Sequence, residues 1–119
     1  MNGELAQLRD IVRQFVDERD WDQFHTPKNL SAALSVEAAE LLEHFQWLKQ
    51  GDAAELGEAK LQQVRHEMAD VLVYLIRLAD KLDVDLHAAV LEKMVLNRAK
   101  YPADVVRGDM RKYNEYKSR

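Results

Sequence analysis

The sequence predicts an all-α protein, and three observations lead to that fold class. Only 4 glycines and 2 prolines occur among 119 residues, which leaves little material for the turns of a β-rich fold. Apolar residues recur at three- and four-residue intervals over long stretches, as they do on one face of an amphipathic helix. Residues that cap helices delimit several of these stretches. We therefore expect a single domain of four main helices arranged like a four-helix bundle.

Composition sets the limits of what this domain can do. We expect one domain over residues 1–119, with a helical core at about 4–101 and a C-terminal tail at 102–119. The formal net charge of −4 argues against sequence-independent binding to nucleic acid, which needs a basic face. No cysteine is present, which excludes disulfides and fits a reducing cytoplasm. Neither an export signal nor a membrane span is found, so we expect a cytoplasmic protein without membrane contacts.

The first helix is predicted at about residues 4–19. The segment Asp20–His25 then breaks the helical period while it holds two large aromatic residues, Trp21 and Phe24. These rings either plug the end of the bundle or contact a ligand. The apolar residues that define the first helix are Leu5, Leu8, Ile11, Val12, Phe15 and Val16.

The second helix should begin at Thr26-Pro27, because threonine caps free N–H groups and proline fits the first turn. It should run to about Gln50, with Gly51 placed to end it. At about 100° per residue, Glu37 borders the apolar face and Glu40 stands on its shoulder. The apolar face consists of Leu30, Leu34, Ala38, Leu41, Phe45 and Leu48.

The third helix is predicted at about residues 58–82, after a polar and alanine-rich connector. Its core face should centre on Met68, and the run Val71–Ile76 is apolar nearly all round. We interpret that run as a dimer interface. The residues Glu67, Asp70 and Tyr74 share one flank of this helix.

The fourth helix is predicted at about residues 86–100, between an acidic cap and Pro102. One of its faces carries Lys93, Asn97 and Lys100. These side chains could meet phosphate oxygens or a base edge, and a solvated charged stripe would have the same pattern.

Two pairs of acidic residues are the candidate metal ligands. Glu37 and Glu40 lie one turn apart on the second helix, and Glu67 and Asp70 repeat that spacing on the third. Ionised carboxylates packed together repel each other and lose hydration, so such a cluster needs a cation. Oxygen-only ligands favour Mg²⁺, with Mn²⁺ as a substitute. Either pair alone is also ordinary helix-surface composition. A ferritin-like di-iron site would need Glu-x-x-His on two helices, and the sequence has none.

Several motifs in order strengthen this interpretation. Together with the two acidic pairs they resemble the all-α MazG-type nucleoside triphosphate pyrophosphohydrolases, above all the short single-domain members that include the dCTP pyrophosphatases. The resemblance extends over most of the chain, from Arg19 to Pro102. The motifs are Arg19–Leu30, Glu37-Ala-Ala-Glu40, Phe45-Gln-Trp47, Glu67-Met-Ala-Asp70 and Asn97–Pro102.

The resemblance implies an oligomeric MazG fold, either a homodimer or a tetramer, with the active site in a cleft between helices two, three and four. It also implies Mg²⁺-dependent hydrolysis of a nucleoside triphosphate between the α- and β-phosphates, which yields the monophosphate and pyrophosphate. We expect dCTP as substrate, with other deoxynucleotides, including damaged ones, close behind. Cleaning of the nucleotide pool would then be the cellular role.

Each candidate residue has an expected role in that reaction. The metal ligands would be Glu37, Glu40, Glu67 and Asp70, with Glu37 or Glu40 as general base. Lys93 and Lys100 would offset charge on the leaving pyrophosphate, and Tyr74 would donate a hydrogen bond. The helix start at His25, Lys28 and Asn29 favours anions. By resemblance, Trp21, Trp47 and Asn97 would form the base pocket.

Two alternatives stay open on the sequence alone. The chain could be a non-enzymatic helical dimerisation module whose carboxylates are only a solvated face. It could also keep the fold and the metal but act on another phosphoanhydride, such as a phosphoribosyl nucleotide or an alarmone.

Overall fold

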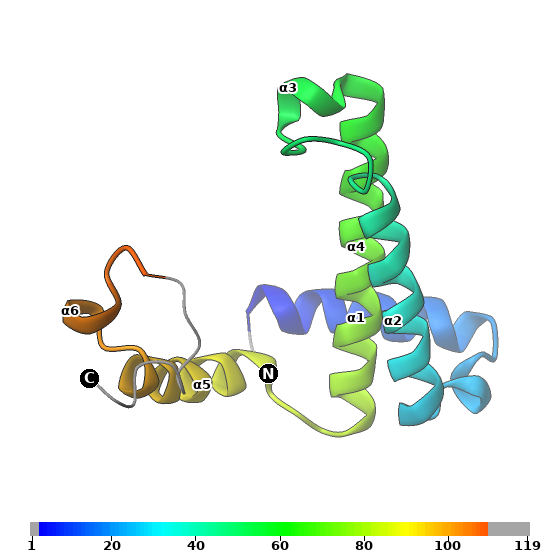
Figure 1. The fold of residues 1–119 in the computed structure, drawn as a ribbon. Helices are drawn as coiled ribbons and strands as arrows, with labels where there is room; N and C mark the ends of the chain where they lie inside the picture. The colour runs from blue at the N-terminus through cyan, green and yellow to red at the C-terminus, as the bar shows by residue number, and fades with distance from the viewer. Residues whose placement is uncertain (1–2, 110–119) are drawn as a thin grey trace. The chain divides into compact units, whose positions relative to one another are not determined.

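In the computed structural model, residues 3–109 are described, and they form helices without any strand (Figure 1). The predicted all-α fold class is confirmed. The chain divides into two compact units, one reaching to Val84 and the other beginning at Asp85. The first unit holds α1 (Glu4–Glu18), η1 (Asp22–Phe24), α2 (Pro27–Glu43), α3 (Ala53–Leu56) and α4 (Glu58–Lys81). The second unit holds α5 (Leu86–Lys100) and α6 (Ala103–Val106).

The first unit is organised around α4. α2 packs along α4, and α1 crosses it (Figure 1). The buried apolar side chains come from all three helices, so these helices share one small core. Those side chains are Val16, Leu30, Val64, Ile76 and Ala79.

α2 begins where the sequence predicts but ends earlier. Thr26 caps it, because its hydroxyl accepts the Asn29 amide at 3.1 Å. The predicted extension to Gln50 is wrong, since α2 ends at Glu43 and turns follow.

The turns after α2 are closed by a single carboxylate that lies outside the helix. Glu55 accepts the backbone N–H groups of Lys49, Gln50 and Gly51 at 2.9 to 3.1 Å, so these amides bond to a side chain instead of to helix carbonyls. Gly51 has φ of +77°, and a Cβ atom there would lie 2.6 Å from the Phe45 ring. The change of direction therefore requires glycine at position 51.

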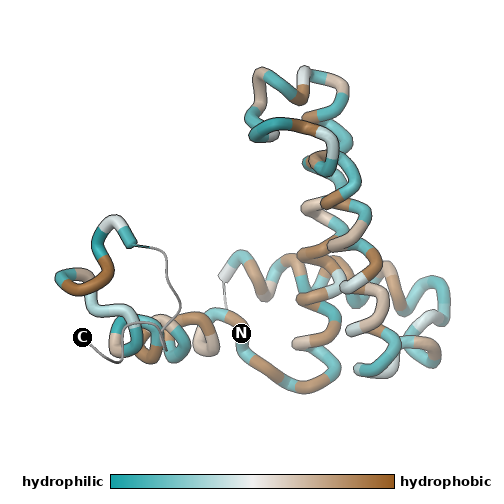
Figure 2. Tube along the Cα trace, in the orientation of Figure 1, coloured by the Kyte–Doolittle hydropathy of each residue, from teal (hydrophilic) through white to brown (hydrophobic). Residues whose placement is uncertain are grey.

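The connector before α4 forms the short helix α3, capped by Asp52, whose carboxylate accepts the Glu55 amide at 2.9 Å. α4 then runs within one residue of its predicted bounds. Apolar and polar residues alternate along it (Figure 2).

The predicted core face of α4, centred on Met68, is only partly right, because Val64 and Ala79 on that face are buried but its centre is not. Met68 is 56% exposed, and Leu72 and Leu75 are also exposed. The flank beside this face also packs inward, since Glu67 on it is half-buried. The reason is that α2 lies against the flank that carries the carboxylates.

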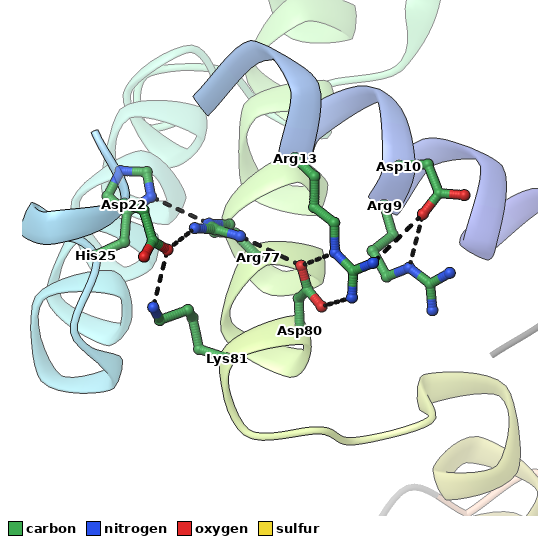
Figure 3. Close-up of polar contacts among 8 residues, drawn as sticks. All are labelled: Arg9, Asp10, Arg13, Asp22, His25, Arg77, Asp80 and Lys81. Carbon is green, nitrogen blue, oxygen red and sulfur yellow. Dashed lines mark hydrogen bonds and ion pairs between the residues drawn. The ribbon is translucent and has the colours of Figure 1, made fainter. Parts of the chain in front are cut away.

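A polar network joins α4 to the N-terminal part of the first unit (Figure 3). Arg77 is 5% exposed and donates to Asp22 and, at 3.2 Å, to Asp80. Asp80 also accepts two hydrogen bonds from Arg13 of α1, at 2.7 and 2.5 Å. Both carboxylates therefore keep the buried guanidinium paired.

The second unit contains the predicted fourth helix. α5 has the predicted bounds, and the Asp85 carboxylate caps it by accepting the Ala88 amide at 3.1 Å. The predicted C-terminal tail is helical in part, because α6 follows Pro102. Residues 110–119 of the tail lie outside the described range. Among the described residues, no helix is both long and apolar enough to span a bilayer.

Candidate active site

The packing of α2 on α4 brings three predicted metal ligands together. Glu37 comes from α2, and Glu67 and Asp70 come from α4. One carboxylate oxygen of each lies within 4.8 Å of the others. Two helices that are far apart in the sequence thus turn their acidic flanks toward each other.

Burial makes this cluster unstable as three bare anions. One oxygen of Glu37, Oε2, and the corresponding oxygen of Glu67 are buried without a hydrogen-bond partner in the described part of the chain. Burial, together with the neighbouring carboxyl groups of Glu40 and Glu67, raises the pKa of Glu37 to about 7. A proton or a cation must relieve this repulsion. The oxygen-only donor set and the two unpaired oxygens fit a hard divalent cation, so the carboxylates could hold a metal ion.

Glu40 lies at the edge of this cluster. It is half-buried on α2 and close enough to Glu37 to raise the pKa of that residue, but it is outside the group of three. The structure thus brings three of the four predicted carboxylates together and places the fourth beside them.

The cluster opens into a pocket of about 500 Å³, lined by Glu37, Asp70 and Tyr74 on its polar side. α1 supplies the apolar wall, which the sequence did not predict as part of the site. The apolar period of α1 indicated only a core helix, yet Ile11 and Phe15 stay exposed. The remaining lining residues are Ile11, Val12, Phe15 and Val73.

A smaller pocket of about 80 Å³ adjoins the first and shares Val12, Phe15, Val73 and Tyr74 with it. Trp21 and His25, two predicted substrate-binding residues, line it together with Arg77. The Trp21 ring meets the Phe15 ring edge-on, with centroids 5.7 Å apart. The sequence analysis did not predict Arg77 as a pocket residue. A signal was present, because Arg77 is a charged residue inside an apolar stretch of a helix and lies three residues before an aspartate.

Other predicted residues lie elsewhere in the first unit. Asn29 is engaged in the start of α2, since its side-chain amide donates to the Phe24 carbonyl at 3.0 Å. Lys28 is exposed beside it. Trp47 falls within the predicted second helix, but it lies in the turns beyond the end of α2 and is 87% exposed. Neither pocket includes Trp47 among its lining residues.

The last three predicted residues lie on α5, in the second unit. Lys93 and Lys100 are exposed, and the Asn97 amide contacts the Met94 sulfur at 3.8 Å. The pocket at the carboxylate cluster has walls from α1, α2 and α4, and the predicted cleft between helices two, three and four stays a prediction. The contribution of α5 stays a prediction.

Fold and site together define a helical protein with a partly buried cluster of carboxylates, able to hold a cation, at the mouth of an apolar pocket. The model of the MazG-like family matches residues 32–115, and the chain belongs to that family. Human dCTP pyrophosphatase 1 is 44% identical over 113 residues, which cover 93% of this chain and 66% of the human protein. The rat dCTP pyrophosphatase 1 is 40% identical over the same shares. The chain thus spans just under two thirds of the length of these relatives.

A solved structure agrees with this assignment. The chain is similar to a pyrophosphatase from Archaeoglobus fulgidus, with 43% identity and a TM-score of 0.77. The match covers 86% of this chain and 95% of the archaeal one. The predicted family is therefore confirmed.

Proposed function

We propose that this protein is a Mg²⁺-dependent nucleoside triphosphate pyrophosphohydrolase. Its substrate would be dCTP or a related deoxynucleotide, cleaved between the α- and β-phosphates to the monophosphate and pyrophosphate. One observation carries the proposal: carboxylate oxygens from Glu37, Glu67 and Asp70 lie within 4.8 Å of one another beside a pocket large enough for part of a nucleotide. The names of the similar proteins point to the same chemistry.

The carboxylates would hold Mg²⁺, with Mn²⁺ as a substitute, and Glu40 would join them from the edge of the cluster. When bound, the cation would neutralise the triphosphate and lower the pKa of an attacking water. Glu37 or Glu40 would accept the proton of that water, as the carboxylate less engaged with metal. Tyr74 lines both pockets and would donate a hydrogen bond near the phosphates.

The nucleoside would take the apolar side of the site. The wall from α1 would contact the nucleoside, and the smaller pocket beside Trp21 and His25 would receive the base. Trp47 and Asn97 would complete that pocket. The start of α2, near Lys28 and Asn29, would favour anionic groups, while Lys93 and Lys100 would offset charge on pyrophosphate.

We further propose that the protein works as a homodimer or tetramer in the cytoplasm, where it would clean the nucleotide pool. The exposed apolar face of α4, with Met68, Leu72 and Leu75, supports an association between copies.

The test is incubation with a panel of nucleoside triphosphates and Mg²⁺, with the products identified by phosphorus NMR. Release of pyrophosphate together with a nucleoside monophosphate is expected, fastest for dCTP. Orthophosphate with a nucleoside diphosphate would contradict the proposed bond cleavage. A phosphoribosyl nucleotide and an alarmone belong in the same panel, because faster turnover of either would change the substrate class. No turnover of any compound would favour the dimerisation module.

A further inference from the structure

Arg77 is the one buried charged residue among residues 3–109, and its contacts fix both its position and its direction. Its two terminal nitrogens donate to Asp22 and Asp80, and Asp80 is held in turn by Arg13. The Asp22 carboxylate also accepts from Lys81, at 2.9 Å (Figure 3). With both terminal nitrogens bound, the guanidinium cannot rotate without breaking ion pairs.

The third nitrogen of this guanidinium meets a histidine. Arg77 Nε donates to His25 Nδ1 at 3.1 Å. A guanidinium Nε always carries a hydrogen and never accepts one, so Nδ1 must be the acceptor. The neutral imidazole has a single N–H group, which then lies on Nε2, and the doubly protonated imidazolium cannot make this contact.

The surroundings of His25 favour the same neutral form. Burial, followed by the charge of Arg77, lowers the pKa of His25, and Lys81 adds to this effect while Asp22 opposes it. The Nε2 atom of His25 makes no hydrogen bond within the described part of the chain. His25 lines the smaller pocket, which shares four lining residues with the pocket at the carboxylate cluster.

We propose that Arg77 is a positioning residue for substrate recognition, which holds His25 as the neutral tautomer with its proton on Nε2. His25 then presents one N–H donor in the small pocket, to an acceptor atom on the edge of the nucleobase, such as the carbonyl oxygen of cytosine. This inference rests on the proposed function for the identity of the ligand. Arg77 itself acts through His25 and touches no reacting atom.

The direct test needs no variant. In the intact protein with ¹⁵N-labelled histidine, the His25 signals are assigned by their loss in His25→Leu, since the chain has 4 histidines. At neutral pH we expect Nε2 to carry the proton and Nδ1 to be unprotonated. A protonated Nδ1, or an imidazolium, would overturn the proposal.

Kinetics then test whether the fixed tautomer matters for recognition. Arg77→Met should raise KM for the best substrate roughly tenfold, the loss expected for one hydrogen bond, and leave kcat nearly unchanged. Arg13→Met is the matched control, because it removes a guanidinium from Asp80 without touching His25. In this control, KM and the His25 spectrum should stay as in the wild type.

A double-variant cycle distinguishes a role of Arg77 in positioning His25 from a role in supporting the pocket wall. If Arg77 acts through His25, adding Arg77→Met to His25→Leu should cost nothing further in KM. An additional tenfold loss would show that Arg77 only supports the pocket wall and would overturn the proposal. Complete absence of triphosphate cleavage by the wild type would instead defeat the proposed function, whereas a wrong tautomer in an active enzyme would defeat this inference alone.

Discussion

Glu37 on α2 and Glu67 on α4 lie side by side, and each buries a carboxylate oxygen that has no hydrogen-bond partner among the described residues. Such an arrangement is destabilising for the bare protein, because both groups lose hydration and repel each other. A divalent cation held by these carboxylates would relieve the repulsion. The proposed site would then lower the stability of the metal-free protein and be stabilised by its ligand.

Mg²⁺ should therefore stabilise the fold. A ligand that binds only the native state at one hundred times its Kd adds about 2.7 kcal/mol to the free energy of unfolding. For a chain of this size we expect Tm to rise by roughly 10 °C. Thermal unfolding with and without millimolar Mg²⁺ measures this shift.

Glu67→Gln is the variant for that experiment. It keeps the size of the side chain but removes one of the repelling charges, so the metal-free protein should melt no lower than the wild type. The response to Mg²⁺ should shrink. A full response in this variant would place the cation elsewhere.

The ligand carboxylates should be needed for turnover but not for folding. Glu40→Gln and Asp70→Asn each remove a candidate metal ligand without leaving a core cavity, so we expect kcat to fall roughly a thousandfold or more while Tm changes little. Steady-state kinetics and thermal melting of the same samples check this expectation. Glu43→Gln, at the exposed end of α2, is the control and should keep wild-type kinetics.

Much of this site was predictable because helical periodicity is a local property. The spacing of Glu37, Glu67 and Asp70 placed them on the acidic flanks of two helices, and α2 and α4 do face each other along those flanks. The early end of α2 was not predictable from periodicity, since the apolar spacing continues to Leu48 while the backbone turns after Glu43. Trp47 therefore lies in turns, and the amides of Lys49, Gln50 and Gly51 bond to the Glu55 carboxylate.

The inward face of α4 was predicted only in part, with Val64 and Ala79 correct and Met68 wrong. A helical wheel ranks residues by hydrophobicity and therefore places Met68 in the core, but packing in one chain is decided by where α2 lies. Arg77 escaped notice because its burial depends on Asp22 of η1 and on His25, which only the fold brings next to it. Its other partner, Asp80, lies three residues further along α4.

Trp47→Ala should change discrimination among bases more than the rate of the chemical step. Trp47 is 87% exposed, so its removal leaves no cavity and Tm should stay constant. Values of kcat/KM for the four deoxynucleoside triphosphates, measured in parallel, check this expectation. An equal loss for every base would show that this tryptophan has no role in base recognition.

Glu55→Ala should loosen the turns that follow α2. The carboxylate is the acceptor for three consecutive backbone amides, and these hydrogen bonds lower the pKa of Glu55. Without it, the amides of Lys49, Gln50 and Gly51 should exchange with solvent faster, which hydrogen exchange observed by NMR resolves residue by residue. The amides in the middle of α4 serve as the internal reference, and their protection should not change.

Asp80 should make stability depend on pH in the acid range. Its hydrogen bond with Arg13 holds the pKa of Asp80 below the ordinary value of 3.8. The stabilisation is thus present above pH 3.8 and is lost as the pH falls through the lower pKa of the folded state. In Arg13→Met this contribution should be reduced. Urea unfolding from pH 6 to pH 2 should give wild-type and variant stabilities that converge at the acid end, and a constant difference would refute this explanation.

The binding of a divalent cation between α2 and α4 is measured most directly by titrating Mn²⁺ into the protein and following the free-ion signal by electron paramagnetic resonance. We predict that the wild type removes Mn²⁺ from solution, that Mg²⁺ competes for the same site, and that the Glu37→Gln, Glu67→Gln double variant binds far less. Equal binding by the wild type and the double variant, or none by the wild type, would contradict the assignment of these carboxylates as a cation site.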